Sequence, residues 1–190
     1  MKNFDVYVKK QLLEKYPSMV FFLVVMLFPH FGAKAFGLFF IMLFSLASDV
    51  RQKRLDLMTF LPLNRRQIFW MEYLFLCLLL STTFFVGLPF AERSIYAWLV
   101  LVRSFIFFSS YFGVIISAVS IGFDPYGAAF LFLLVDLVLG GIGSSQLGPT
   151  FNPYKLISPV YQANLLASLV FALILIYMAY RLFTQRGGER

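Results

Sequence analysis

The chain has 190 residues, of which 61% are hydrophobic and only 13% are charged, and its formal net charge is +7. Soluble globular domains are about half apolar and about a quarter charged, so this composition leaves too little polar surface to cover a soluble globule. We therefore predict an all-α integral membrane protein. A basic chain could bind nucleic acid, but the positions of these charges follow membrane topology, and we expect no nucleic-acid partner.

The first predicted element, residues 1–16, is a basic amphipathic helix. Its apolar residues recur every four positions, close to the helical period: Phe4, Val8, Leu12 and Tyr16. A helix of this kind before a first span is expected to lie in the interface plane of the membrane. The rest of the chain, 17–190, is predicted to form one transmembrane domain. No small-residue cleavage site follows the first apolar run, so we expect no removable signal peptide.

The apolar run 18–47 is interrupted near Pro29 and again by Lys34. A spanning helix needs about 20 residues, so the run can be drawn as one long helix or as two short ones. A single crossing would place the basic N-terminus and the basic segment after the run on opposite sides, against the positive-inside rule. We therefore predict two spans, at about 17–30 and 33–47.

The interval 48–67 holds five of the sixteen Lys and Arg residues between long apolar runs. Asp49 and Gln52 form an N-cap and N3 pair, and the residue before Pro62 is disfavoured in a helix, so a helix is predicted at 50–61. Its apolar residues share one side at about 100° per residue: Val50, Leu57, Met58 and Leu61. Its polar residues lie opposite: Gln52, Asp56 and Thr59. This pattern predicts a short amphipathic helix at the membrane surface.

The chain restarts as a helix directly after Pro62. Asn64 is followed three residues later by Gln67, which is the pattern of a capping box, and Leu63 can pack on Ile68 as a hydrophobic staple. Arg65 and its neighbour Arg66 are then expected in the headgroup layer, where the chain enters the next apolar run.

Four further spans are predicted, at about 68–88, 97–121, 128–142 and 160–182. A turn is expected at 122–127, and a glycine-rich external segment precedes the last span. Small residues four positions apart predict close helix packing at two places. These are Ala33 with Gly37, and Ser109 with Gly113 and Ser117.

The basic residues define the predicted orientation of the six spans, with both termini in the cytoplasm. Twelve Lys or Arg residues then lie in cytoplasmic segments: residues 2, 9, 10, 15, 51, 53, 54, 65, 66, 181, 186 and 190. Three lie in outer segments: Lys34, Arg93 and Lys155. This bias predicts a multi-pass protein of the inner (cytoplasmic) membrane.

Two charged residues, Arg103 and Asp136, fall inside predicted spans, where charges are costly and are usually paired or functional. Each lies six residues from the outer end of its span, so antiparallel neighbours would place them at similar depth. An intramembrane ion pair is the simplest prediction, and a role in a substrate route or at a subunit interface is the alternative. Glu72, one turn into its span, is expected to be solvated and balanced by Arg65.

The order of features in the 48–67 interval resembles the segment between the second and third membrane helices of ABC-2 type transporter permeases. These features are an acidic residue, a basic amphipathic helix, Leu-Pro-Leu-Asn-Arg-Arg and then a span. The N-terminal interfacial helix and the six-span layout extend the resemblance over the whole chain. Glu72 departs from the pattern, because relatives commonly carry a basic residue there.

The resemblance implies that the interval is a cytoplasmic coupling helix that docks on an ATPase subunit. The residues that it assigns to docking are Val50, Arg51, Arg54, Leu57, Met58, Leu61, Pro62 and Arg65. It further implies a second permease subunit, which forms a homodimer or heterodimer with this chain in the lipid bilayer. The direction of transport that it implies is outward. ATP and Mg²⁺ would bind the separate P-loop ATPase, with no cofactor in this chain. The corresponding external segment, 143–157, often forms short helices that re-enter the outer leaflet.

The sequence contains no P-loop, no H-E-x-x-H and no G-x-S-x-G motif, and its one cysteine, Cys77, excludes a disulfide framework or a thiol metal site. With one histidine, His30, expected as an interfacial side chain, we predict no enzyme, no catalytic residues and no metal. Two alternatives to the permease remain open. One is a small six-span substrate-binding component of a vitamin importer, which lacks a docking helix. The other is a structural subunit of another membrane complex, which fits the basic residues equally well.

Overall fold

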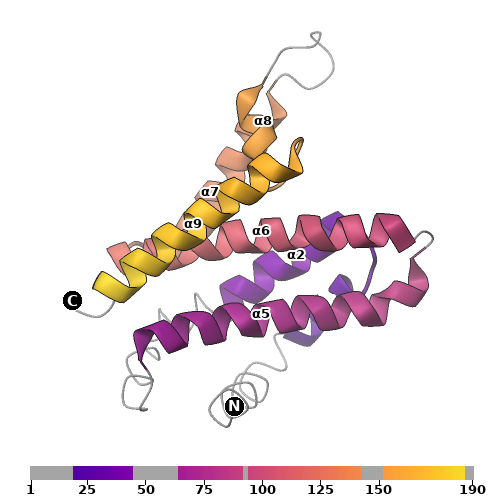
Figure 1. Ribbon diagram of the computed structural model, residues 1–190, viewed down its shortest axis with the longest axis horizontal. Coiled ribbons are helices and arrows are strands. Elements are labelled where there is room, and N and C mark those ends of the chain that lie inside the picture. Colours follow the sequence, from indigo (N-terminus) through magenta and orange to yellow (C-terminus); the bar gives the residue numbers. More distant parts are fainter. Residues whose placement is uncertain (1–18, 45–63, 92–93, 143–151, 187–190) are drawn as a thin grey trace.

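The computed structural model describes residues 19–44, 64–91, 94–142 and 152–186, and these residues are helical with short connections and no strand (Figure 1). A first helical segment covers residues 19–26. The helices that follow are α2 (Phe31–Met42), α5 (Arg65–Gly87), the 3₁₀-helix η2 (Leu88–Phe90), α6 (Ser94–Ile121), α7 (Pro125–Gly141), α8 (Pro153–Ile157) and α9 (Leu165–Arg186). The all-α prediction is therefore confirmed for the part of the chain that the structure describes.

Three of the helical stretches are long and apolar enough to cross a membrane: Arg65–Phe90, Ile95–Ile121 and Leu165–Gln185. Two shorter helices, α2 and α7, are also apolar. The prediction of a membrane protein is supported at this level. The described helices match the predicted spans closely at α5 and α6. The last helix begins at Leu165 rather than near residue 160, because residues 158–164 form a turn.

The first apolar run forms two helices rather than one, as the charge argument predicted. Residues 27–30 form a turn, and α2 folds back along the segment 19–26. A Cβ at Gly37 would clash with Met26 Cγ and lie 2.9 Å from the Phe22 carbonyl oxygen, so the two helices approach there more closely than a larger residue allows. The turn itself contacts the end of α5, because a Cβ at Gly87 would meet the Leu27 carbonyl oxygen.

Local sequence signals account for the helix ends that flank α5 and α7. The Asn64 N–H donates to the Gln67 side chain at 2.9 Å, which confirms the predicted start of α5. Gly122 ends α6 with φ +89°, a conformation that glycine adopts at little cost, and the Phe123 N–H donates to the Ala118 carbonyl at 2.9 Å. Asp124 then caps α7, accepting from the Gly127 N–H at 2.7 Å. The predicted turn at 122–127 is therefore present.

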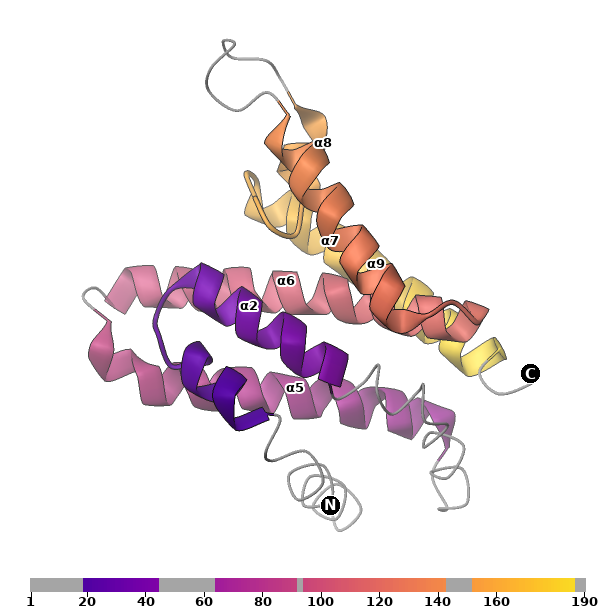
Figure 2. The same cartoon turned by 180° about the vertical axis from the view of Figure 1, so that it is seen from behind.

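Helix α6 lies at the centre of the fold. It runs antiparallel to α5, α2 lies across both, and α7 and α9 cross its C-terminal half from opposite sides (Figure 2). The predicted small-residue face of α6 is where α9 packs, because a Cβ at Gly113 would lie 2.9 Å from the carbonyl carbon of Leu175. Ser109 on the same helix contacts α5 instead, through a 2.9 Å hydrogen bond between its hydroxyl and that of Tyr73.

The buried core between α2, α5 and α6 combines aliphatic side chains with several aromatic rings. The rings of Phe39 and Tyr111 meet edge to face at 5.7 Å, and those of Phe69 and Phe112 at 5.3 Å. Aromatic pairs in such arrangements add to the stability that burial provides. The abundant phenylalanine therefore serves the packing of this chain as well as its apolar surface.

The chain reversals lie in three places. Helix α5 begins, α6 turns into α7 and α9 ends at the left of Figure 1, η2 leads into α6 at the right, and α7 reverses through α8 into α9 at the top. Helix α2 runs from the turn beside Gly87 toward the end at which α5 begins. The predicted alternation of six spans stays a prediction.

Candidate functional site

The predicted docking residues Val50, Arg51, Arg54, Leu57, Met58, Leu61 and Pro62 lie outside the described residues, as do the interfacial helix 1–16 and the predicted coupling helix 50–61. Their roles stay predictions. The eighth docking residue, Arg65, begins α5 and is partly buried. It lines a groove at the end of the molecule where α5 begins and α9 ends.

Asp136, on α7, is fully buried and accepts three hydrogen bonds. Tyr154 donates its phenol hydrogen at 2.9 Å, Ser158 its hydroxyl hydrogen at 2.7 Å, and Val160 its backbone N–H at 3.1 Å. A buried carboxylate needs such partners, since its charge is otherwise far too costly to remove from water. One carboxyl group thus holds three positions of the segment between α7 and α9.

Arg103, on α6, holds the same segment from the other side. Its Nη2 donates to the Tyr161 carbonyl at 3.0 Å, and its guanidinium lies 4.7 Å from the centre of the Phe31 ring at the start of α2. Gln162 returns the contact, donating from Nε2 to the Arg103 carbonyl at 2.9 Å. Gln162 has φ +48°, an unusual backbone conformation for a residue other than glycine, and these contacts hold it.

The predicted direct ion pair between Arg103 and Asp136 is therefore not formed. Instead, each residue bonds to the segment 158–162, which separates them. Both residues nevertheless contact the same short segment of the chain. The sequence argument missed that the turn before α9 supplies closer partners than the opposite charge, because hydroxyl groups and backbone groups in a turn carry no periodic signal.

The group formed by Arg103, Asp136, Tyr154, Ser158, Tyr161 and Gln162 is called here the outer polar cluster. It fixes how α9 starts relative to α6 and α7. Asn152 adds to it, since its amide donates to the carbonyls of Leu139 and Ile142 at the end of α7 (2.7 and 2.9 Å) and its Oδ1 caps α8. The short helix α8 agrees with the expectation of short helices near 143–157.

The hydrogen bonds of the outer polar cluster hold the segment before α9 against α6 and α7. Burial, with the neighbouring Asp136 carboxylate, raises the pKa of the Tyr154 phenol, so the phenol remains a hydrogen-bond donor at neutral pH. Asp136 is the only carboxylate in the cluster. Among the described residues, no group of three or more His, Cys, Asp or Glu could hold a metal ion.

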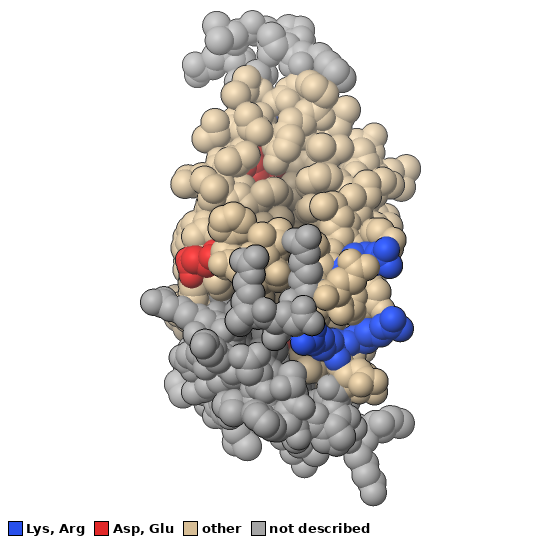
Figure 3. Space-filling view, turned by 90° about the vertical axis from the view of Figure 1, so that its left-hand side faces the viewer, with Lys and Arg blue, Asp and Glu red and all other residues tan. Residues whose placement is uncertain are grey.

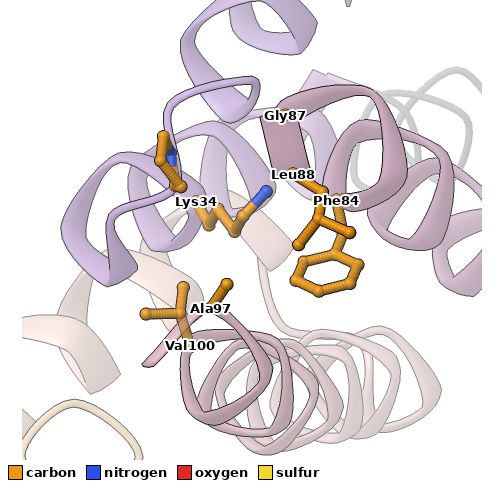
Figure 4. Close-up of a pocket in the computed structure, with 7 residues that line it drawn as sticks. Lys34, Phe84, Gly87, Leu88, Ala97 and Val100 are labelled. Carbon is orange, nitrogen blue, oxygen red and sulfur yellow. The ribbon is translucent and has the colours of Figure 1, made fainter. Parts of the chain in front are cut away.

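Lys34 is buried in the structure. Its side chain is only 1% exposed, and its Nζ donates to the Met26 carbonyl at 2.8 Å, while its place in an outer segment stays a prediction. That carbonyl ends the helical segment 19–26, so the ammonium group interacts favourably with a helix C-terminus. Figure 4 shows the side chain extending toward the end of α5, near Phe84 and Leu88.

The pocket around Lys34 is narrow and otherwise apolar. It leaves no room for a water molecule between α2, the end of α5 and the start of α6. Lys34 thus ties the hairpin of the first apolar run to its own turn. Lys34 lies eight residues after the end of the segment 19–26, across a tight turn. This spacing is the sequence signal that could have predicted its hydrogen bond to the helix end.

Two further expectations concern Glu72 and His30. Glu72 is 1% exposed, so the expectation that it is solvated is wrong: it faces the interior of the helix packing rather than the membrane surface. His30 is exposed and caps α2, its Nδ1 accepting from the Gly32 N–H at 3.2 Å. The interfacial role expected for His30 stays a prediction.

Comparison of the chain with protein families, with curated proteins and with solved structures finds no match in any of the three.

Proposed function

We propose that this chain is the transmembrane permease subunit of an ABC transporter of the ABC-2 type, an exporter energised by separate P-loop ATPase subunits. It crosses the inner membrane six times with both termini in the cytoplasm, and it pairs with a second permease. It is not an enzyme by itself, because ATP and Mg²⁺ bind the partner ATPase. The proposal rests on the resemblance of the 48–67 interval, to which the fold adds geometric support.

The observation that carries the proposal is the direction of the helices around that interval. Helix α2 runs toward the end at which α5 begins, and the α6–α7 turn and the end of α9 lie at that same end (Figure 1). A segment joining α2 to α5 is thereby anchored where a cytoplasmic partner could reach it. The capped start of α5 at Asn64 provides a fixed exit from the segment.

The proposed six spans include two hairpins. The first is the segment 19–26 with α2, and the second is α7 with α9 through α8. The described lengths of α2 and α7, 12 and 17 residues, are below the roughly 20 residues of a full span. Reporter fusions after residues 67, 124 and 190 should report cytoplasm, and those after 32, 93 and 150 the outside. A cytoplasmic signal after residue 32 would reduce the first hairpin to a surface feature.

The test of function is docking. Leu57→Asp places a charge on the apolar face of the predicted helix 50–61 and should abolish co-purification of the partner ATPase, while the permease stays inserted. Thr59→Asp is the matched control, since residue 59 lies on the opposite, polar face. Equal binding by both variants and the unsubstituted chain would remove the main support for the permease proposal.

A further inference from the structure

A basic groove lies between the start of α5 and the end of α9, and of its lining residues the transport proposal uses only Arg65. It has a volume of about 420 Å³ and is lined by Asn64, Arg65, Arg66, Tyr180, Arg181, Thr184 and Gln185. Three of the seven residues are arginines and none is acidic. Figure 3 looks onto this end of the molecule, where basic side chains gather on one side, away from the acidic ones.

Two other polar groups of the groove have partners within the chain. The Asn64 N–H is bonded to Gln67, and the Thr184 hydroxyl donates to the Tyr180 carbonyl at 2.8 Å. The three guanidinium groups are the charged donors that the groove offers to a ligand. Arg66 and Arg181 are exposed, and Arg65 is partly buried. Helix α5 supplies Arg65 and Arg66 to the groove, and α9 supplies Arg181.

The depth of the groove is marked by aromatic side chains. Trp70 lies one to two turns into α5, 44% exposed, with its ring 6.1 Å from that of Tyr180. Exposed Tyr177 lies on the adjoining turn of α9. Tryptophan and tyrosine at the ends of apolar helices mark the level of the lipid headgroups. The arginines thus lie just outside that level, beside the phosphate layer.

From this geometry we propose that the groove binds the headgroup of an anionic phospholipid from the leaflet at this end of the molecule. Guanidinium groups bind phosphate through two parallel hydrogen bonds, and basic pockets between membrane helices suit anionic headgroups. The acyl chains would then lie along the apolar outer faces of α5 and α9. An acidic surface of a protein partner is the competing occupant, and soluble phosphate is a second source of the same ligand chemistry.

The two tryptophans of the chain allow a direct measurement. Trp98 lies near the start of α6, and Trp98→Phe leaves Trp70, beside the groove, as the single fluorophore. The full chain carrying this change is placed in two kinds of vesicle, both made of phosphatidylcholine and phosphatidylglycerol. In one kind the phosphatidylglycerol is brominated, and in the other the phosphatidylcholine is brominated. We expect brominated phosphatidylglycerol to quench Trp70 more strongly than brominated phosphatidylcholine at equal content. Equal quenching by the two lipids would overturn the proposal.

Substitution then assigns the preference to the groove. Arg65→Gln, Arg66→Gln and Arg181→Gln together should lower the preference for phosphatidylglycerol at Trp70 by about fivefold, since each arginine near an anionic surface contributes to it. Lys2→Gln, Lys9→Gln and Lys10→Gln remove the same charge elsewhere and should leave the preference unchanged. An equal loss in both variants would reduce the effect to general membrane electrostatics. Arg181→Gln alone, at the exposed edge, gives a smaller loss if the triple variant does not fold.

Two further outcomes would overturn the lipid assignment. Inorganic phosphate that removes the preference, where chloride at matched ionic strength does not, would make the groove a site for soluble anions. If the arginine variants bind lipid normally but lose the ATPase partner, the groove is a protein contact. The lipid measurement needs no ATPase, so its failure is distinct from failure of the docking test.

Discussion

Helices α6 and α9 are both long enough to span a membrane and have nearly the same mean hydropathy, yet they differ in how much of each is buried within the chain. In its most apolar stretch, 67% of α6 is buried within the chain but only 17% of α9. The buried residues of α9 recur along the helix at four positions: Ser168, Ala172, Ala179 and Phe183. Several other residues of α9 are partly buried, whereas the apolar side chains of Leu166, Val170 and Leu173 are exposed. Hydropathy therefore reports suitability for a membrane, whereas packing depends on small residues and polar contacts at particular positions.

The largest expected effect tests the contact between these two helices. Gly113→Leu forces a side chain into the backbone of Leu175, which a Cβ alone would approach to 2.9 Å. We expect a loss of about 3 kcal/mol in the free energy of unfolding, at the upper end for overpacking. Unfolding in detergent micelles, followed by circular dichroism, measures it. Val170→Leu, a similar change on the exposed face of α9, should have almost no effect, and equal losses would contradict the comparison.

The second effect concerns how the outer polar cluster positions α9. Asp136→Ala leaves the donors of Tyr154, Ser158 and Val160 without their acceptor and should lower stability by about 2–3 kcal/mol. Asp136→Asn, which keeps an acceptor oxygen, should lose less. The same unfolding measurement applies.

Adding Arg103→Ala to Asp136→Ala distinguishes the observed arrangement from a direct ion pair. Because each residue bonds to the segment 158–162 and not to the other, the double variant should be less stable than either single variant. In a direct pair, the second change would partly restore stability by removing an uncompensated charge. A double variant more stable than Arg103→Ala would indicate a direct ion pair between Arg103 and Asp136.

A smaller effect is expected at the contact of α5 with α6. Tyr73→Phe removes the 2.9 Å hydrogen bond to Ser109 and should cost about 1 kcal/mol. A double-mutant cycle with Ser109→Ala isolates the pairwise energy. Tyr177→Phe, at an exposed position on α9, is the matched control and should be neutral. A coupling energy near zero would mean that burial alone holds α5 against α6.

The smallest effect should come from the outer face of α9. Leu173 and Ile174 are more than half exposed, so changing either to alanine should alter stability within about 0.5 kcal/mol. Unfolding in micelles and in vesicles checks this. A large loss would show that another chain covers this face, and the contrast between α6 and α9 would then describe a separated subunit.

Short-range sequence signals determined much of this fold. The capped start of α5 at Asn64, the glycine turn at 122 and the cap at Asp124 depend on residues within one turn of each other, so local chemistry is sufficient. The membrane character follows from composition alone. The close contact at Gly113 was predictable as a small-residue face, although the sequence did not name α9 as its partner.

Only the tertiary structure decided where the charges went. Arg103 bonds to a carbonyl 58 positions away, at Tyr161, and Asp136 bonds to groups 18 to 24 positions away. The burial of Lys34 and Glu72 likewise depends on which helices close over them. A buried charge takes whichever donors and acceptors the assembled fold brings within hydrogen-bond distance, and the periodicity of a single helix carries no record of those distant partners. The turn at residues 158–164 is hydrogen-bonded to α6 and α7. Because these residues are already held in the turn, α9 begins only at Leu165.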